Sequence, residues 1–352
     1  YKCLLLWVDD LLVYASDEQA LLEALKQVFE RLHKKGIFLS TKKCKMFLTE
    51  VEWCGHVISK DGIKYKEELL KSLYEMPPPC TAADLQQFVC ACNWIRAAVP
   101  DFAEHIAPLQ AVLTEAMKVA GSSKKRKLSG IQLRFCGWND TVQDAFVNMK
   151  ALVAAAVRRA HPDPEKVMCL FQDASDMFWS VFLTQVREDE YRDPDKALSE
   201  MNHEPLAFLS GQFRGAQLNW SILEKEAFPI VHGCQELRHF LYRREGFVMF
   251  TDHRNLIYLF DPNARAFGLP RNVSAKLERW ALSTLALRHY VIYHIDGESN
   301  VMADAIIDLH KNSEKTKEIC ASARAKVLDF DWNPNEKLII GSVEENNSAH
   351  IW

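Results

Sequence analysis

The sequence lacks the features that mark membrane and secreted proteins. Among its 352 residues, no apolar run reaches the ~20 residues that a membrane-spanning helix needs. The start at Tyr1 has no basic segment and no small-residue cleavage site, so it does not resemble a secretory signal. The chain also opens inside an apolar run, which predicts a fragment of a longer polypeptide. We therefore expect no membrane partner.

Cysteine signatures for zinc or disulfides are also missing. The ten cysteines are scattered, and the closest pair, Cys90 and Cys92, is separated by one residue. There is no CxxC pair and no Cys/His spacing typical of zinc. Reduced thiols in an intracellular protein are the simplest interpretation. The formal net charge of -4 neither favours nor excludes nucleic acid, so phosphate binding would depend on local basic patches.

Residues 167–310 carry the pattern of a mixed sheet flanked by helices. The apolar, strand-like runs lie at residues 168–175, 178–186, 204–213, 247–253 and 289–297. Helices are expected from Ser221, between the last two strands, and from Asn300. A meander of three strands followed by alternating helices and strands indicates a mixed five-stranded sheet. The whole chain is then a multidomain protein of α/β and α+β architecture.

Four acidic residues stand at the ends of these elements: Asp173, Glu226, Asp252 and Asp304. Asp173 and Asp252 are expected at the ends of two strands. Glu226 is expected on a helix, and Asp304 at the start of another. Mg²⁺ prefers oxygen ligands, and two such ions can activate water and stabilise the leaving oxygen in phosphodiester cleavage. We predict that folding gathers these acids around two Mg²⁺ ions, with Mn²⁺ as the alternative.

Each acid also has an ordinary structural interpretation. Asp173 and Asp252 would serve as turn residues at strand ends. Asp304 would be a first-turn acid, which interacts favourably with a helix N-terminus. Their joint occurrence, in this order and on this strand pattern, favours a shared metal site.

Two glutamates of the same helix compete for one place in the site. Apolar periodicity does not choose between Glu224 and Glu226. Ser221 and Glu224 form an S-x-x-E capping box, which gives Glu224 a local role and leaves Glu226 for the site. Pro229 falls inside this helix, where it removes a backbone hydrogen bond and bends the axis. Such a bend would displace Glu226.

The N-terminal residues 1–16 form two apolar runs that meet at Asp9 and Asp10. This pattern predicts a β-hairpin with both acids at its tip. A solvated turn is the simple interpretation of the pair. A Mg²⁺ site is the functional alternative, because Asn-Gly or Asp-Gly would form the turn more easily.

Several stretches resemble gypsy-type LTR retrotransposon Pol polyproteins. WVDDLLVYA is similar to the Y-x-D-D box of reverse transcriptases, with Trp7 in place of the family's tyrosine. GIFLSTKKCKMF, VEWCGHVISKDGI and MPPPCTAADLQQFVCACNWIRAAVPDFAEHIAPL resemble the end of the palm and the thumb. LFQDAS, NWSILEKEAFPIV, FTDHRNLIYL and GESNVMADAI follow the order of the ribonuclease H motifs. Ser180 and residues 305–308 depart from the family pattern without removing a predicted ligand.

The resemblance implies a domain organisation. It places a partial reverse-transcriptase palm at 1–75, a helical thumb at 76–120, a linker and tether helix at 121–166, a ribonuclease H-like domain at 167–310 and a tail of uncertain structure at 311–352. In the family, the acids that match Asp9 and Asp10 bind the polymerase metals together with an acid further upstream. That acid would precede Tyr1, so the polymerase site is expected to be incomplete in this chain.

The implied activity is that of a retroelement reverse transcriptase/ribonuclease H fragment. It would cut the RNA strand of RNA–DNA hybrids by a two-metal mechanism, within a polyprotein that also carries RNA-directed DNA polymerase activity. Its partners would be the hybrid, template-primer nucleic acid and the rest of Pol, in the cytoplasm, in retrotransposon particles or in the nucleus. Arg271, Lys276 and Arg279 would form a phosphate-tracking face. The alternative is a catalytically inactive, nucleic-acid-binding remnant, and the oligomeric state stays open.

Overall fold

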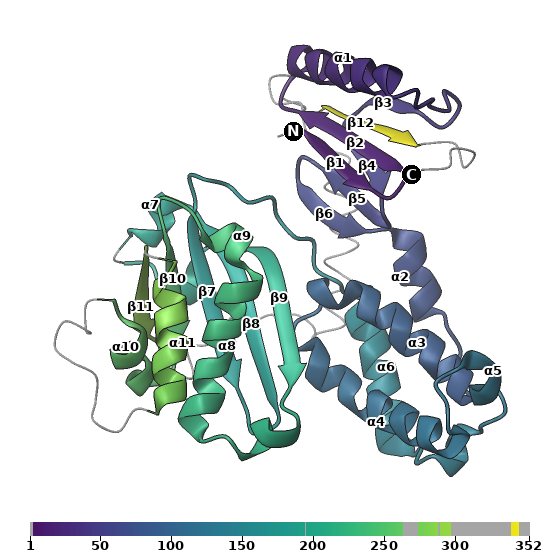
Figure 1. Cartoon of the computed structure of the whole chain (residues 1–352). Helices are drawn as coiled ribbons and strands as arrows, with labels where there is room; N and C mark the ends of the chain where they lie inside the picture. The colour runs from purple at the N-terminus through teal and green to yellow at the C-terminus, as the bar shows by residue number, and fades with distance from the viewer. Residues whose placement is uncertain (1–2, 194, 263–273, 288, 297–338, 345–352) are drawn as a thin grey trace. The chain divides into compact units, whose positions relative to one another are not determined.

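A computed structural model gives the fold of the chain (Figure 1). It describes residues 3–193, 195–262, 274–287, 289–296 and 339–344. The chain divides into two compact units, one formed by residues 1–69 and 319–352, the other by residues 70–318. None of the helices in the described part of the chain combines the length and apolar character needed to cross a membrane.

The first unit contains a four-stranded sheet, ordered β1-β2-β12-β3, and a three-stranded sheet, ordered β4-β5-β6. All the pairs in both sheets are antiparallel. The strands are β1 (Leu4–Trp7), β2 (Asp10–Ala15), β3 (Lys45–Leu48), β4 (Glu50–Trp53), β5 (His56–Ser59), β6 (Gly62–Tyr65) and β12 (Ile339–Glu344). Part of the C-terminal tail thus forms a strand, β12, between β2 and β3.

Helix α1 (Glu18–Lys34) packs against the four-stranded sheet. The Asp17 side chain caps it by accepting a hydrogen bond from the backbone N–H of Ala20 at 2.8 Å. Leu21, Leu25 and Val28 recur at helical spacing and are buried with Val13 of β2. Helix α2 (Glu67–Tyr74) follows, at the boundary between the two units.

The predicted N-terminal hairpin is present, but its tip is shifted by one residue. Trp7 pairs with Asp10, so the turn consists of Val8 and Asp9, and Asp10 is the first residue of β2. Val8 has a φ of 52°, which is unusual for a β-branched residue. The expectation that both acids form the turn is therefore wrong for Asp10.

The second unit begins with a group of packed helices. They are α3 (Ala82–Ile95), α4 (Phe102–Ala120), α5 (Lys125–Leu128) and α6 (Asp140–Ala154), with 3₁₀ turns at Arg96–Ala98 and Leu133–Phe135. A capping box between Thr81 and Asp84 starts α3. The ring centroids of Phe88 and Phe146 lie 4.6 Å apart, and these two side chains pack α3 against α6.

The rest of the second unit is built around a mixed five-stranded sheet, ordered β11-β10-β7-β8-β9, as predicted. Its strands are β7 (Val167–Ala174), β8 (Phe178–Val186), β9 (Glu204–Gln212), β10 (Phe247–Thr251) and β11 (Tyr290–His294). The pairs β7–β8 and β8–β9 are antiparallel, whereas β10 runs parallel to both β7 and β11. The other described elements are α7 (Glu188–Tyr191), α8 (Ile222–Glu236), α9 (Arg238–Leu241), α10 (Arg254–Phe260), α11 (Ala275–Leu285) and 3₁₀ turns at Leu198–Glu200 and Gly215–Asn219.

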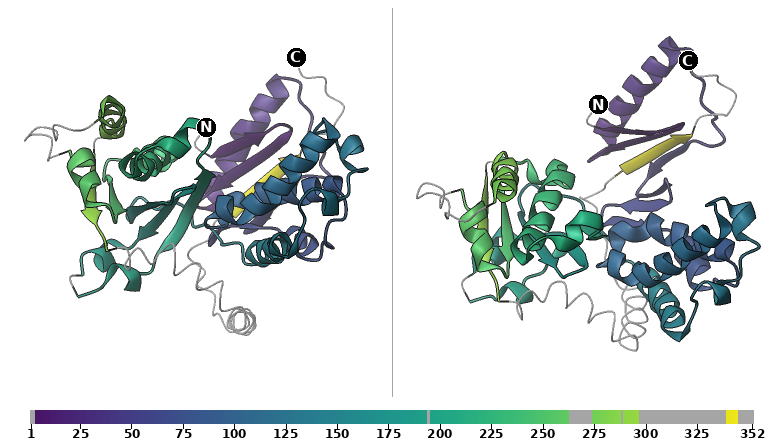
Figure 2. Two further views of the ribbon diagram at one scale, coloured as in Figure 1. Left: turned by 90° about the horizontal axis from the view of Figure 1, so that it is seen from below. Right: turned by 60° about the horizontal axis from the view of Figure 1, so that its bottom comes forward.

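Both faces of this sheet are apolar. Successive residues of a strand point to opposite sides of the sheet, and here consecutive strand residues are apolar and buried. Helices α8 and α11 lie side by side (Figures 1 and 2), and both contribute to a buried core that includes Leu170, Leu183 and Met249 from the strands. On the other face, Phe171 stacks on Phe250 with ring centroids 4.9 Å apart. The two cores fix the sheet between them and so fix the strand ends.

Gly246, directly before β10, should not tolerate a side chain. Its φ is +74°, and an added Cβ would lie 2.2 Å from the backbone oxygen of His289. We expect Gly246→Ala to lower the free energy of unfolding by about 3 kcal/mol through backbone strain and overpacking. Chemical denaturation would measure this change.

Gly215→Ala is the matched control, since Gly215 has a φ of +56° with nothing within 4 Å of the added Cβ. This variant should lose stability through backbone strain alone, on the order of 1 kcal/mol. Equal losses in the two variants would contradict the proposed clash with His289.

Candidate metal centre

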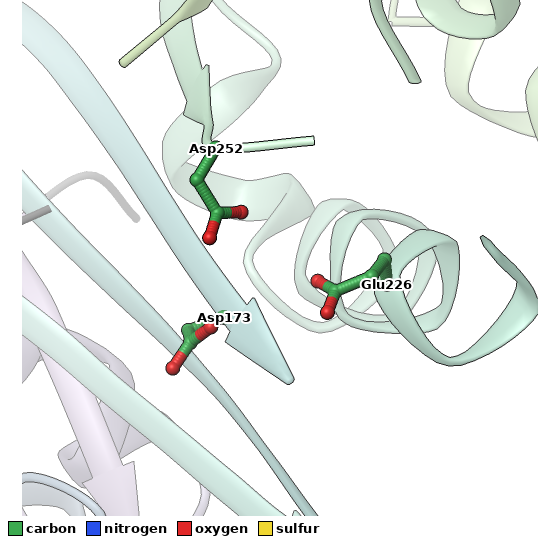
Figure 3. Close-up of side chains that lie close together, drawn as sticks. All are labelled: Asp173, Glu226 and Asp252. Atoms are coloured by element: carbon green, nitrogen blue, oxygen red, sulfur yellow. The ribbon is translucent and has the colours of Figure 1, made fainter. Parts of the chain in front are cut away.

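Three of the four predicted acids meet at one edge of the five-stranded sheet. Asp173 is the next-to-last residue of β7, and Asp252 directly follows β10, the parallel neighbour of β7. Glu226 comes from α8. One carboxylate oxygen of each residue lies within 4.8 Å of the others, and Figure 3 shows the three side chains pointing toward one another. No other group of three such ligands occurs among the described residues.

The electrostatics of this cluster favour a bound cation. All three carboxylates are partly buried. Burial raises the pKa of Glu226 to about 8, and the neighbouring carboxylates of Asp252 and Asp173 add to the rise. Oε2 of Glu226 and Oδ1 of Asp252 are buried without a hydrogen-bond partner among the described residues. Because such acceptors are normally paired, the cluster fits a hard divalent ion that would neutralise the charge and take up these oxygens.

Local structure explains why Glu226, rather than Glu224, reaches the cluster. Ser221 and Glu224 form the predicted capping box at the start of α8. Glu224 also pairs with Lys276 at 3.3 Å, so its carboxylate is occupied. Pro229 is accommodated within α8, which continues to Glu236, and Glu226 stays in the cluster. The expected displacement by Pro229 does not occur.

The remaining predicted site residues do not join this cluster. Asp304 lies outside the described residues. Asp9 and Asp10 belong to the β1–β2 hairpin of the other unit. Within the part of the chain that the structure describes, they form no group of three or more metal-ligating side chains.

The predicted phosphate-tracking face is not supported at Lys276. Its ammonium lies 3.4 Å from the ring centroid of Trp220 and 4.8 Å from that of Trp280, in addition to its pair with Glu224. This group is thus engaged within the fold. Arg271 lies outside the described residues, and Arg279 is exposed.

Three further residues, adjacent in sequence or hydrogen-bonded to residues of the cluster, were not predicted from the sequence. Lys225 is 8% exposed and pairs with Asp176 at 3.1 Å. His294 places Nε2 3.1 Å from the backbone oxygen of Asp252, so Nε2 donates the hydrogen bond. Gln172, next to Asp173, is buried without a partner among the described residues. Only Gln172 leaves a signal in the sequence, as a polar residue inside an apolar strand.

Comparison with protein families gives two matches. Residues 163–290 match the RNase H-like domain found in reverse transcriptase. Residues 1–58 match reverse transcriptase (RNA-dependent DNA polymerase). The chain therefore combines a reverse-transcriptase segment with an RNase H-like domain, which is the class of protein that its sequence motifs predict.

The similar curated proteins are retrotransposon polyproteins. The retrovirus-related Pol polyprotein from transposon opus of Drosophila melanogaster is 26% identical over 339 residues, which cover 93% of this chain and 31% of that protein. The corresponding polyprotein from transposon 297 is 25% identical over 357 residues, covering 99% of this chain and 30% of that protein. The chain thus spans about a third of these relatives. Its sequence is similar to these Pol polyproteins, and the gypsy-type resemblance is consistent with their names.

Solved structures share the fold. A foamy viral protease-reverse transcriptase, solved in complex with an RNA/DNA hybrid, has a TM-score of 0.59 at 17% identity and covers 84% of this chain and 36% of that one. The same protein type in complex with double-stranded DNA has a TM-score of 0.58 at 18% identity, with 84% and 55% covered. These structures support the predicted α/β architecture.

Proposed function

We propose that the RNase H-like domain cleaves the RNA strand of RNA–DNA hybrids with two divalent metal ions. The observation that carries this proposal is the carboxylate cluster at the edge of a mixed sheet, with two buried oxygens that have no hydrogen-bond partner among the described residues. When bound, Mg²⁺ would supply an activated water and charge stabilisation for the leaving oxygen. The carboxylates of Asp173, Glu226 and Asp252 would hold it, with Asp304 as the proposed fourth ligand.

The proposed substrate follows from the fold and from the relatives. A foamy viral protease-reverse transcriptase of the same fold was solved with an RNA/DNA hybrid. We propose that this chain likewise binds hybrids and template-primer nucleic acid, as part of a longer Pol polyprotein. Such a polyprotein would act in the cytoplasm, in retrotransposon particles or in the nucleus.

Cleavage of a labelled hybrid tests the proposal. With Mg²⁺, the full chain is expected to cut the RNA strand internally and to leave the same RNA intact when it is single-stranded. Chelation by EDTA should stop the reaction, and Mn²⁺ should restore it. Products would be resolved on denaturing gels. Absence of Mg²⁺-dependent cleavage would refute the activity, and binding of the hybrid without cleavage would favour the inactive remnant.

The polymerase part is proposed to be incomplete in this chain. Nucleotide addition requires converging carboxylates around two metals, and among the described residues Asp9 and Asp10 belong to no group of three or more metal-ligating side chains. We propose that a further acid, supplied by other Pol sequence, completes this site in a palm formed by residues 1–75. Primer extension by the chain alone, and after addition of that sequence, tests this assignment.

A further inference from the structure

The side chain of a buried glutamine next to the carboxylate cluster has no hydrogen-bond partner among the described residues. Gln172 is 2% exposed and lies on β7 immediately before Asp173. Both its amide nitrogen and its amide oxygen are buried and unpaired among the described residues. An unpaired buried amide destabilises a fold, so packing alone does not account for glutamine at this position.

The strand register locates the Gln172 side chain relative to α8. Gln172 pairs with Val181 of β8 and, by alternation, faces the same side of the sheet as Leu170. Leu170 and Val181 belong to the core that α8 covers. Gln172 therefore lies in the layer between the sheet and the helix that carries Glu226.

The neighbouring strand β10 brings Asp252 to the same end of the sheet as Gln172, and Oδ1 of Asp252 has no partner among the described residues. Phe250 of β10 lies opposite Phe171 of β7 in parallel register. Thr251 therefore runs beside Gln172, and Asp252 follows at the edge of the sheet. The unpaired amide and the unpaired oxygens of the cluster thus occur together at the ends of two adjacent strands.

A second buried glutamine in the same sheet shows how such a residue is satisfied when its role is structural. Gln185 is 1% exposed. Its Nε2 donates to the backbone oxygen of His161 and to Oε2 of Glu204, each at 2.8 Å. Its Oε1 accepts from the backbone N–H of Asp163 at 2.9 Å. Both side-chain polar atoms of Gln185 are paired, whereas neither side-chain polar atom of Gln172 has a partner among the described residues.

We propose that Gln172 is a positioning residue of the metal centre. Its amide N–H donates to the Glu226 carboxylate, directly or through one water, when the carboxylate turns to bind a divalent cation. The amide thereby holds Glu226 in the orientation that binds the ion. Residues that orient metal ligands in this way contribute strongly to metal affinity. This inference rests on the proposed function of the cluster.

Gln172→Met in the full chain tests the proposal, because methionine has a similar volume and no polar hydrogen-bonding group in need of a partner. In EDTA, the variant should unfold at the same temperature as the wild type or at a higher one, since it loses only an unpaired amide. Its Kd for Mg²⁺, measured by isothermal titration calorimetry, should rise about tenfold or more. A structural role would give the opposite pattern.

Gln185→Met provides the control, with a lower unfolding temperature in EDTA and an unchanged Kd for Mg²⁺. The proposal is overturned if Gln172→Met binds Mg²⁺ with a Kd within twofold of the wild type, or if it is less stable or unfolded in EDTA. An equal rise in Kd for both variants would also overturn it. If the wild type itself binds no Mg²⁺, the proposed function of the cluster fails, and the inference fails with it.

Discussion

Replacement of Asp252 by asparagine is expected to abolish Mg²⁺-dependent cleavage of an RNA–DNA hybrid while the fold persists. Asparagine keeps the size of the side chain but removes the negative charge that a divalent cation requires. Residues that merely support metal ligands change activity by about 10–100-fold. Loss of a direct ligand should therefore reduce the cleavage rate by at least about a hundredfold.

The fold should survive this change because the Asp252 carboxylate destabilises the metal-free protein. Its Oδ1 is buried without a partner among the described residues, and its carboxylate raises the pKa of Glu226. Removing the charge relieves this repulsion, so the unfolding temperature in EDTA should not fall. Asp252 also follows β10 rather than lying within it, and the β7–β10 pairing does not depend on its side chain.

Asp189→Asn is the matched control for the same chemical change. Asp189 lies in α7 of the same unit, its side chain is 64% exposed, and it pairs with nearby Arg187. This variant should cut the hybrid at the wild-type rate. Rates would be taken from single-turnover time courses, with circular dichroism as the check on folding. If Asp252→Asn kept more than about a tenth of the wild-type rate, Asp252 would not be a metal ligand.

The five-stranded sheet could be predicted because its signal is local. Each strand is an apolar run bounded by polar or turn residues, and alternation within the runs matches the two buried faces. The capping boxes at Thr81 and Ser221 are also local, since both partners lie within one turn of a helix. Such features need no knowledge of distant contacts.

The carboxylate cluster depends on contacts that the sequence does not encode locally. Asp173 and Asp252 come together because β7 and β10 pair in parallel, and Glu226 joins them because α8 packs on the same sheet. From the order of the motifs alone, the convergence of these three carboxylates is a hypothesis. The unpaired state of Gln172 and the contact of His294 with Asp252 could not be predicted, since each depends on neighbours far along the chain.

The shifted hairpin tip has a different physical cause. Two adjacent acids look like a turn by composition, whereas the observed turn begins at Val8, a residue type that disfavours positive φ. Register is set by the pairing of whole strands, here from Leu4 with Val13 to Trp7 with Asp10. Local turn preferences are overridden when the strand pairing requires it.

Raising the pH from about 5 to above 8 is expected to destabilise the metal-free chain because of Glu226. Its pKa is raised from 4.5 to about 8 in the folded protein. Between these values the folded state keeps a proton that the unfolded state has released, so the free energy of unfolding falls as pH rises and levels off above pH 8. Each pKa unit corresponds to about 1.4 kcal/mol. Allowing for water at this partly exposed site, we expect a loss of about 2 kcal/mol.

Glu226→Gln isolates this contribution, since the amide stays neutral at every pH. In EDTA, the variant and the wild type should be nearly equal in stability at pH 5, and the variant should be more stable at pH 8.5. Addition of Mg²⁺ at pH 8.5 should then stabilise the wild type, because bound cation offsets the clustered charge. It should leave Glu226→Gln nearly unchanged.

Glu236→Gln is the control, because Glu236 is an exposed residue at the other end of the same helix. It should follow the wild-type profile with pH and with Mg²⁺. Urea denaturation at several pH values, with EDTA or with Mg²⁺, measures all three proteins. A wild-type profile that is flat between pH 5 and pH 8.5 in EDTA would contradict a buried, repelled carboxylate at Glu226. Such a profile would mean that the three carboxylates do not concentrate negative charge at one point in the metal-free protein.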